Sequence, residues 1–189
     1  MMNQLDLARN FALMVAFSVV AAMGMQPTVT QAAGARELEE DARTALQRLY
    51  RTAPAARSLA KRAKGILVFP SVVKAGLMIG GQYGEGVLFK GGRASGFYST
   101  AGASYGLQAG AQKFGYALFF MNDAALSYLG NSDGFEIGAG PSVVMMDQGM
   151  AKHSSTTTLS QDVYAFIFGQ EGLMAGIGLQ GNKITKIDK

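Results

Sequence analysis

The feature that most constrains the fold of this chain is the recurrence of glycine among short apolar runs from Gly65 to the C-terminus. Ile66–Phe69, Gly86–Phe89 and Gly115–Met121 are examples of such runs. The 189 residues include 25 glycines but only 4 prolines. This balance is typical of β-strands whose backbones approach closely, and differs from a flexible low-complexity chain. The C-terminal two thirds are therefore predicted to be mostly β-structure.

Several strand boundaries follow from local signals. Pro70 is expected to close the strand Ile66–Phe69, and the glycines at Gly80–Gly84 are expected to form a connection. Val163–Phe168 is apolar on both faces, which predicts a fully buried strand. A Gly-Asn pair separates Leu173–Leu179 from Lys183–Ile187, which predicts a hairpin.

Helices are predicted at the N-terminal side. Arg36–Arg51 carries one apolar face at helical spacing, formed by Leu38, Ala42, Ala45, Leu46 and Leu49. A second helix is expected from Pro54 to Gly65, with Thr52 as its N-cap. A third short helix, Asp123–Leu129, follows Asn122 as its cap and precedes Gly130.

These elements predict an α+β domain, with two N-terminal helices packed on a strongly curved, glycine-rich antiparallel β-sheet or barrel of six or more strands. Residues 1–35 are predicted to be a cleaved signal peptide. Arg9 precedes the apolar run Phe11–Met25, and small residues follow at Ala32 and Ala35. An uncleaved anchor is the alternative, but the run is shorter than the roughly 20 residues of a membrane span. Residues 36–189 then form one domain.

Catalytic and metal-binding patterns are sparse. The chain has no cysteine and a single histidine, His153, in a polar loop with no acidic residue within three positions. These counts argue against a zinc site, and no Gly-x-Ser-x-Gly elbow supports a Ser-His-Asp triad. The glycines of Gly80–Gly86 do not have the spacing of a nucleotide-binding loop. The sequence therefore predicts a protein without enzymatic activity, metal or cofactor.

Positive charge is concentrated near the second predicted helix. Seven Lys or Arg but one acidic residue, Glu85, occur between Arg57 and Arg93. The candidate binding residues are Arg57, Lys61, Arg62, Lys64 and Lys74. At about 1 kcal/mol per cation near an anionic membrane, they would supply about 4–5 kcal/mol, which corresponds to weak and salt-sensitive binding. A solvated helix face is the alternative interpretation. Nucleic acid is not expected as a partner, because no recognised nucleic-acid-binding module is present and export would separate the protein from it.

Long motifs in this chain are similar to a known family. GILVFPSVVKAGLMIGGQYGEGVL (65–88) resembles the signature of the SYLF domain, also known as the yeast actin-binding domain. The similarity continues in order through GFYSTAGASYGLQAGAQ (96–112), ALFFMND (117–123), GFEIGAGPSVV (134–144) and DVYAFIFGQEGLMAGIGLQGNKITKI (162–187).

The resemblance implies a non-enzymatic, membrane-associated domain. Eukaryotic members bind phosphoinositides through an N-terminal amphipathic helix and basic residues, and yeast members bind actin filaments. By position, the lipid-binding region corresponds to Arg57, Lys61, Arg62 and Lys64, with Lys74 in the signature block. The export signal suggests a bacterial envelope protein, for which an actin role is not expected, and the absence of cysteine excludes a lipoprotein anchor.

The sequence thus predicts a periplasmic or secreted protein, peripheral on a membrane, that binds anionic phospholipid or phosphoinositide head groups through its second helix. A second hypothesis is an envelope structural or scaffold protein whose ligand is another protein. A third is a hydrolase that uses a serine and His153.

Overall fold

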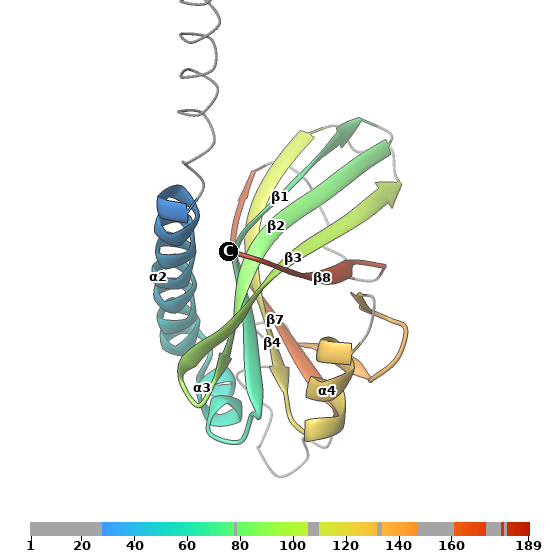
Figure 1. Cartoon of the computed structure of the whole chain (residues 1–189). Helices are drawn as coiled ribbons and strands as arrows, with labels where there is room; N and C mark the ends of the chain where they lie inside the picture. The colour runs from blue at the N-terminus through green and yellow to red at the C-terminus, as the bar shows by residue number, and fades with distance from the viewer. Residues whose placement is uncertain are drawn as a thin grey trace, which may run out of the picture. The chain divides into compact units, whose positions relative to one another are not determined.

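The domain is built around one curled β-sheet (Figure 1). The computed structural model describes residues 28–77, 79–105, 110–131, 134–146, 161–172, 179 and 181–189. The chain divides into two compact units, Met1–Gly34 and Ala35–Lys189, and the fold below is that of the second. The predicted signal peptide remains a prediction. None of the described helices is both long and apolar enough to cross a membrane.

The described residues form three helices and eight strands. The helices are α2 (Thr28–Thr52), α3 (Pro54–Ala60) and α4 (Asp123–Asn131). The strands are β1 (Gly65–Leu77), β2 (Ile79–Lys90), β3 (Arg93–Tyr105), β4 (Gly110–Phe120), β5 (Phe135–Glu136), β6 (Val143–Met146), β7 (Val163–Gly172) and β8 (Lys183–Ile187). The sheet order is β5-β8-β3-β2-β1-β4-β7-β6. The predicted α+β class and curved sheet are therefore confirmed.

Both faces of the sheet are buried along the first part of β1 and the parts of β2 and β4 that pair with it. On one face, Ile66 and Val68 of β1 pack with the apolar side of α2 and α3. On the other, Leu67 and Phe69 pack with α4 and with the aromatic side chains of β4. Because side chains alternate across a strand, this double burial requires apolar residues at successive positions. β7 follows the same rule from Val163 to Phe166, which are buried on both faces, whereas Ile167 and Phe168 are only partly buried.

One strand pair departs from the antiparallel prediction. β6 runs parallel to β7, with Val143 opposite Val163, whereas the other pairs are antiparallel. The predicted strand Leu173–Leu179 lies outside the described residues except for Leu179, so the proposed hairpin is not tested. Its other half, Lys183–Ile187, forms β8 and pairs with β3 and β5.

Pro70 does not end its strand as predicted. β1 continues to Leu77, and its register with both β2 and β4 shifts between Val68 and Val72. A β-bulge at this point accommodates a residue that has no N–H to donate to a neighbouring strand. The prediction was wrong because one bulge lets a long strand pass through a proline.

The glycines at Gly80–Gly84 do not form a connection but lie within β2. The tight turn falls earlier, where Gly76 pairs with Gly80 and Leu77 with Ile79. Further along β2, a Cβ on Gly86 would lie 2.5 Å from the carbonyl oxygen of Val68 and 2.6 Å from the Phe69 ring. Glycine is needed here because the strands curl tightly over an aromatic core.

The helix boundaries also differ from the predictions. α3 ends at Ala60, and its N-cap is Ala53, which makes no side-chain cap hydrogen bond. The Thr52 hydroxyl instead donates to the carbonyl oxygens of Arg48 and Leu49 at the end of α2. The predicted cap of α4 is confirmed, because Asn122 Oδ1 accepts a hydrogen bond from the Ala125 amide at 2.8 Å.

Candidate functional site

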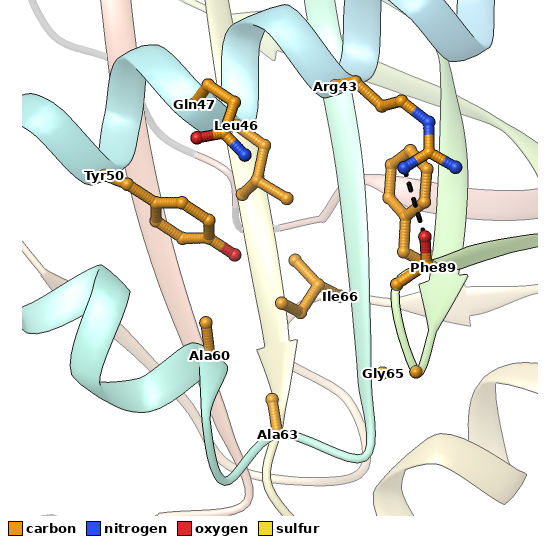
Figure 2. A pocket seen from close by; sticks show the side chains of 11 residues that line it. Arg43, Leu46, Gln47, Tyr50, Ala60, Ala63, Gly65, Ile66 and Phe89 are labelled. Atoms are coloured by element: carbon orange, nitrogen blue, oxygen red, sulfur yellow. Dashed lines mark hydrogen bonds between the residues drawn. The ribbon is translucent and has the colours of Figure 1, made fainter.

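A pocket of about 550 Å³ opens between α2, the chain that follows α3, and the β2–β3 turn (Figure 2). Leu46, Ile66 and Phe89 provide much of its apolar lining, and Ala60 and Ala63 add small side chains from the α3 end. Its volume lies in the range of small-molecule sites. The remaining lining residues are Arg43, Gln47, Tyr50, Gly65, Gly91 and Gly92.

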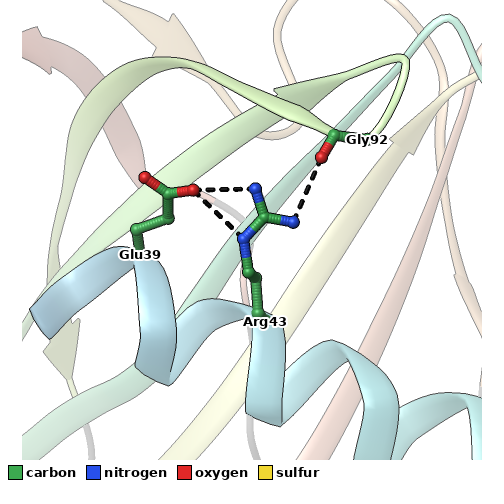
Figure 3. A network of polar contacts seen from close by, with 3 residues as sticks. All are labelled: Glu39, Arg43 and Gly92. Carbon is green, nitrogen blue, oxygen red and sulfur yellow. Dashed lines mark hydrogen bonds and ion pairs between the residues drawn. The ribbon is translucent and has the colours of Figure 1, made fainter. Parts of the chain in front are cut away.

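Arg43 stands at one end of this pocket. Its guanidinium carbon lies 4.9 Å from the centre of the Phe89 ring, within the range of a cation–π contact. It donates to the Glu39 carboxylate at 2.7 and 3.1 Å and to the carbonyl oxygen of Gly92 at 3.1 Å (Figure 3). The guanidinium is thus oriented by α2 on one side and by the β2–β3 turn on the other.

The β2–β3 turn owes its shape to two glycines. Gly91 and Gly92 have φ values of 55° and 78°, and they connect the paired residues Lys90 and Arg93. A two-residue hairpin with positive φ at both central positions strongly favours glycine. This turn brings the Gly92 carbonyl within reach of Arg43.

Tyr50 lies toward the other end of the pocket, about two turns of α2 after Arg43 (Figure 2). Burial raises the pKa of its hydroxyl to about 12, and it is the sole cause of the shift. The Tyr50 hydroxyl can both donate and accept a hydrogen bond in the pocket wall.

Four of the five predicted binding residues lie together. Arg57 is exposed on α3, and Lys61, Arg62 and Lys64 are exposed in the segment directly after it. Lys64 Nζ lies 3.6 Å from the Asp123 carboxylate at the start of α4, in a solvent-exposed pair. Ala60 and Ala63 from the same segment line the pocket. We call Arg57, Lys61, Arg62 and Lys64 the basic segment.

Lys74 lies apart from the basic segment. It is only 7% exposed, in the part of β1 beyond the bulge. It is directly opposite Gln82 on β2 and Gln112 on β4, which are also buried. Gln82 in turn hydrogen-bonds Asn182. The structure therefore places Lys74 in a buried polar row and not on the surface that the charge count suggested.

A buried hydroxyl pair lies on this same face of the sheet. The Tyr116 hydroxyl is 2.7 Å from the Thr100 hydroxyl oxygen, and both residues are fully buried. Burial raises the pKa of Tyr116 well above its usual value, although hydrogen bonds to Thr100 and Asn182 oppose the shift. The two hydroxyls are thus hydrogen-bond partners inside the sheet.

The pocket residues Arg43, Tyr50 and Phe89 were not predicted from the sequence. They come from α2 and β2, which are far apart in the chain, so no local pattern joins them. The Lys-Gly-Gly-Arg sequence was a signal for the turn that borders the pocket. Within the described residues, no group of three or more His, Asp and Glu could hold a metal ion. His153 lies outside those residues.

Comparison with protein families identifies the C-terminal part of the chain. Residues 101–189 match the family model Ysc84, which is described as Las17-binding protein actin regulator. This stretch is therefore similar to the Ysc84 (SYLF) family, which supports the resemblance of the motifs from residue 101 onward, whereas the motif at 65–88 precedes the matched residues. The Ysc84 match begins within β3, so α2, α3 and the basic segment precede the matched residues. A comparison with curated protein sequences finds no match.

Proposed function

We propose that this protein is a non-enzymatic module that binds anionic phospholipid or phosphoinositide head groups through its basic segment. Ysc84 (SYLF) domains are a family of binding domains associated with lipids and actin. The observation that carries the proposal is that Arg57, Lys61, Arg62 and Lys64 are all exposed within eight residues of one another, at and just after α3. We propose that the protein lies in the periplasm or outside the cell, and we do not propose actin as its partner.

The structure reduces the expected strength of this contact. With Lys74 buried, four cations remain, and at about 1 kcal/mol each they would supply about 4 kcal/mol. That energy corresponds to a dissociation constant of about 1 mM before any apolar contact is added. Binding by these charges should fall steeply with salt, because exposed charges are screened within about 10 Å at 0.1 M ionic strength.

Vesicle co-sedimentation over a salt series tests the proposal. The variant Arg57→Glu/Lys61→Glu/Lys64→Glu is expected to lose binding to phosphatidylglycerol vesicles. A control variant, Arg36→Glu/Lys113→Glu/Lys186→Glu, changes three other exposed cations and has the same net charge. It should keep most of the binding. Equal binding by all three proteins, or equal binding to anionic and neutral vesicles, would contradict the proposal.

A second candidate function is that of a scaffold that binds another protein. It is favoured by an apolar strip on β1 and β2, where Val73, Ile79 and Tyr83 are 52%, 64% and 54% exposed. Val73 is directly opposite Tyr83, and Ile79 lies on the same side of β2 as Tyr83. Exposed apolar patches commonly mark interaction sites. Val73→Glu/Ile79→Glu should then abolish co-purification of an envelope protein without changing vesicle binding.

A further inference from the structure

We infer that the pocket beneath α2 accepts one acyl chain of an anionic phospholipid, while the phosphate stays outside, beside Arg43. The inference rests on the proposed function and extends it. In the proposed function, the basic segment binds to the charged surface of a membrane. In this inference, one acyl chain of a single lipid also leaves the membrane and enters the protein. Three features of the pocket lead to it.

The first feature is the combination of shape and chemistry. Arg43 and Tyr50 border the pocket and are seven residues apart on α2, which corresponds to about 10 Å along the helix. Between them the walls include Leu46, Ile66 and Phe89. The volume of about 550 Å³ far exceeds the roughly 30 Å³ of one water molecule. A flexible apolar chain fits the space beside Leu46, Ile66 and Phe89, whereas a charged head group placed against these side chains would lose its hydration.

The second feature is the position of Arg43 at the pocket's end. Its guanidinium lies over Phe89 and is held by the Gly92 carbonyl, so its orientation is set before any ligand arrives. Its other contact is the Glu39 carboxylate one helical turn away, and both side chains are partly exposed. Such surface pairs contribute little to stability. A phosphate can therefore replace Glu39 and accept the same two N–H groups, which is the bidentate geometry that guanidinium favours.

The third feature is that residues 60–64 contribute both to the pocket wall and to the exposed basic segment. Ala60 and Ala63 line the pocket, while Lys61, Arg62 and Lys64 are exposed. The exposed cations of the basic segment are thus next in sequence to residues of the pocket wall. This charge arrangement favours an anionic amphiphile over a neutral apolar ligand.

The experiment uses a monomeric lipid, so that it does not depend on binding to a membrane. The chain has no tryptophan. Tyr50→Trp therefore places a single fluorophore in the pocket wall, and Tyr128→Trp places a control fluorophore on α4. Titration with dihexanoyl phosphatidylglycerol below its micellar concentration should give a saturable blue shift for Trp at position 50 and none at position 128. The free head group, glycerophosphoglycerol, should bind at least about tenfold more weakly.

Pocket filling supplies the second arm. Ala60→Leu/Ala63→Leu, in the Tyr50→Trp background, should weaken binding of the short-chain lipid at least about tenfold. Ala124→Leu on the exposed side of α4 is the matched control and should leave it unchanged. Circular dichroism checks that each variant folds. Arg43→Met, which keeps the packing on Phe89, should weaken binding several-fold and reduce its dependence on salt, whether or not the double variant folds.

Three outcomes would overturn the inference: no saturable binding, equal affinity for the free head group, or undiminished binding by a folded pocket-filled variant. Hexanoate binding as tightly as the phospholipid would also overturn it, because the ligand would then be a fatty acid. These outcomes are separate from the vesicle test. Loss of vesicle binding on charge reversal with no entry of lipid into the pocket would support the proposed function and reject only this inference.

Discussion

The two faces of the sheet are both apolar, yet they are packed in different ways. On the face under α4, Phe69 stacks on Tyr116 with ring centres 4.7 Å apart, and Phe120 meets Phe135 edge-on at 5.9 Å. On the face under α2, Leu46, Ile66 and Phe89 border a pocket of about 550 Å³. The helices of this second face are followed by the exposed basic segment. Both faces therefore contribute to the core, and the face under α2 also leaves space for a ligand.

The largest expected effect tests this difference in packing. Phe69→Ala should lower the free energy of unfolding by about 4 kcal/mol, because a fully buried ring is replaced by a cavity. Leu46→Ala should cost about 2 kcal/mol, because one side of Leu46 already borders an open pocket and makes fewer contacts. Urea denaturation measures both. Equal losses would show that the pocket face is packed as tightly as the other.

The next largest effect is expected from replacing glycines that differ in how closely other atoms surround them. Gly86→Ala should destabilise the protein by about 2–3 kcal/mol, because the new Cβ would meet the Val68 carbonyl and the Phe69 ring. At Gly81 the nearest atom is the Gly102 carbonyl oxygen, 3.8 Å away, so Gly81→Ala should be nearly neutral. Thermal unfolding of the two variants measures this difference. A neutral Gly86→Ala would mean that the strands can relax apart there.

A smaller effect is expected for the buried hydroxyl pair. Tyr116→Phe should cost about 1–2 kcal/mol, because the Thr100 hydroxyl loses its 2.7 Å partner inside the sheet. Tyr50→Phe on the pocket face should change the free energy of unfolding little at pH 7. A double-mutant cycle with Thr100→Val isolates the pair. If Tyr116→Phe and Thr100→Val prove additive, the hydrogen bond contributes no stability of its own.

The smallest effect is a dependence on alkaline pH. Burial raises the pKa of Tyr50 to about 12 in the folded protein, above the 10.0 expected when it is unfolded. The stability linked to its protonated form is therefore complete below pH 10 and is lost as pH rises from 10 toward 12. Tyr50→Phe should make the decline over this window shallower, as measured by urea midpoints at pH 9, 10 and 11. An unchanged decline would indicate that the phenol ionises equally in both states.

The basic residues show where prediction from sequence succeeded and where it could not. Arg57, Lys61, Arg62 and Lys64 follow one another closely, so a local pattern was enough to group them. Lys74 belongs to the same basic stretch of sequence but is 7% exposed. Its side chain lies in line with Gln82 and Gln112 across three strands. Charge counts cannot detect such a row, because strand pairing joins residues that are distant in sequence.

The pocket illustrates the same limit more strongly. Arg43 and Phe89 are 46 positions apart and meet because α2 packs over β2. Pro70 shows a different limit. A proline is expected to end a strand, but β1 continues past Pro70 through a bulge because it is paired with strands on both sides. Local sequence signals therefore predicted where helices and strands occur. Pairing with strands distant in sequence decided where each strand ends.

The sequence by itself determined the α+β class, the buried character of β7, the cap of α4, the absence of cysteine chemistry and the family resemblance. Each depends on residue type or on spacing within one element. Only the tertiary structure decided that Lys74 is buried, that Arg43 stands over Phe89, and that a pocket lies between α2 and the sheet. The physical reason is that side-chain environment depends on which strands and helices become neighbours, and that is set by packing of the whole domain.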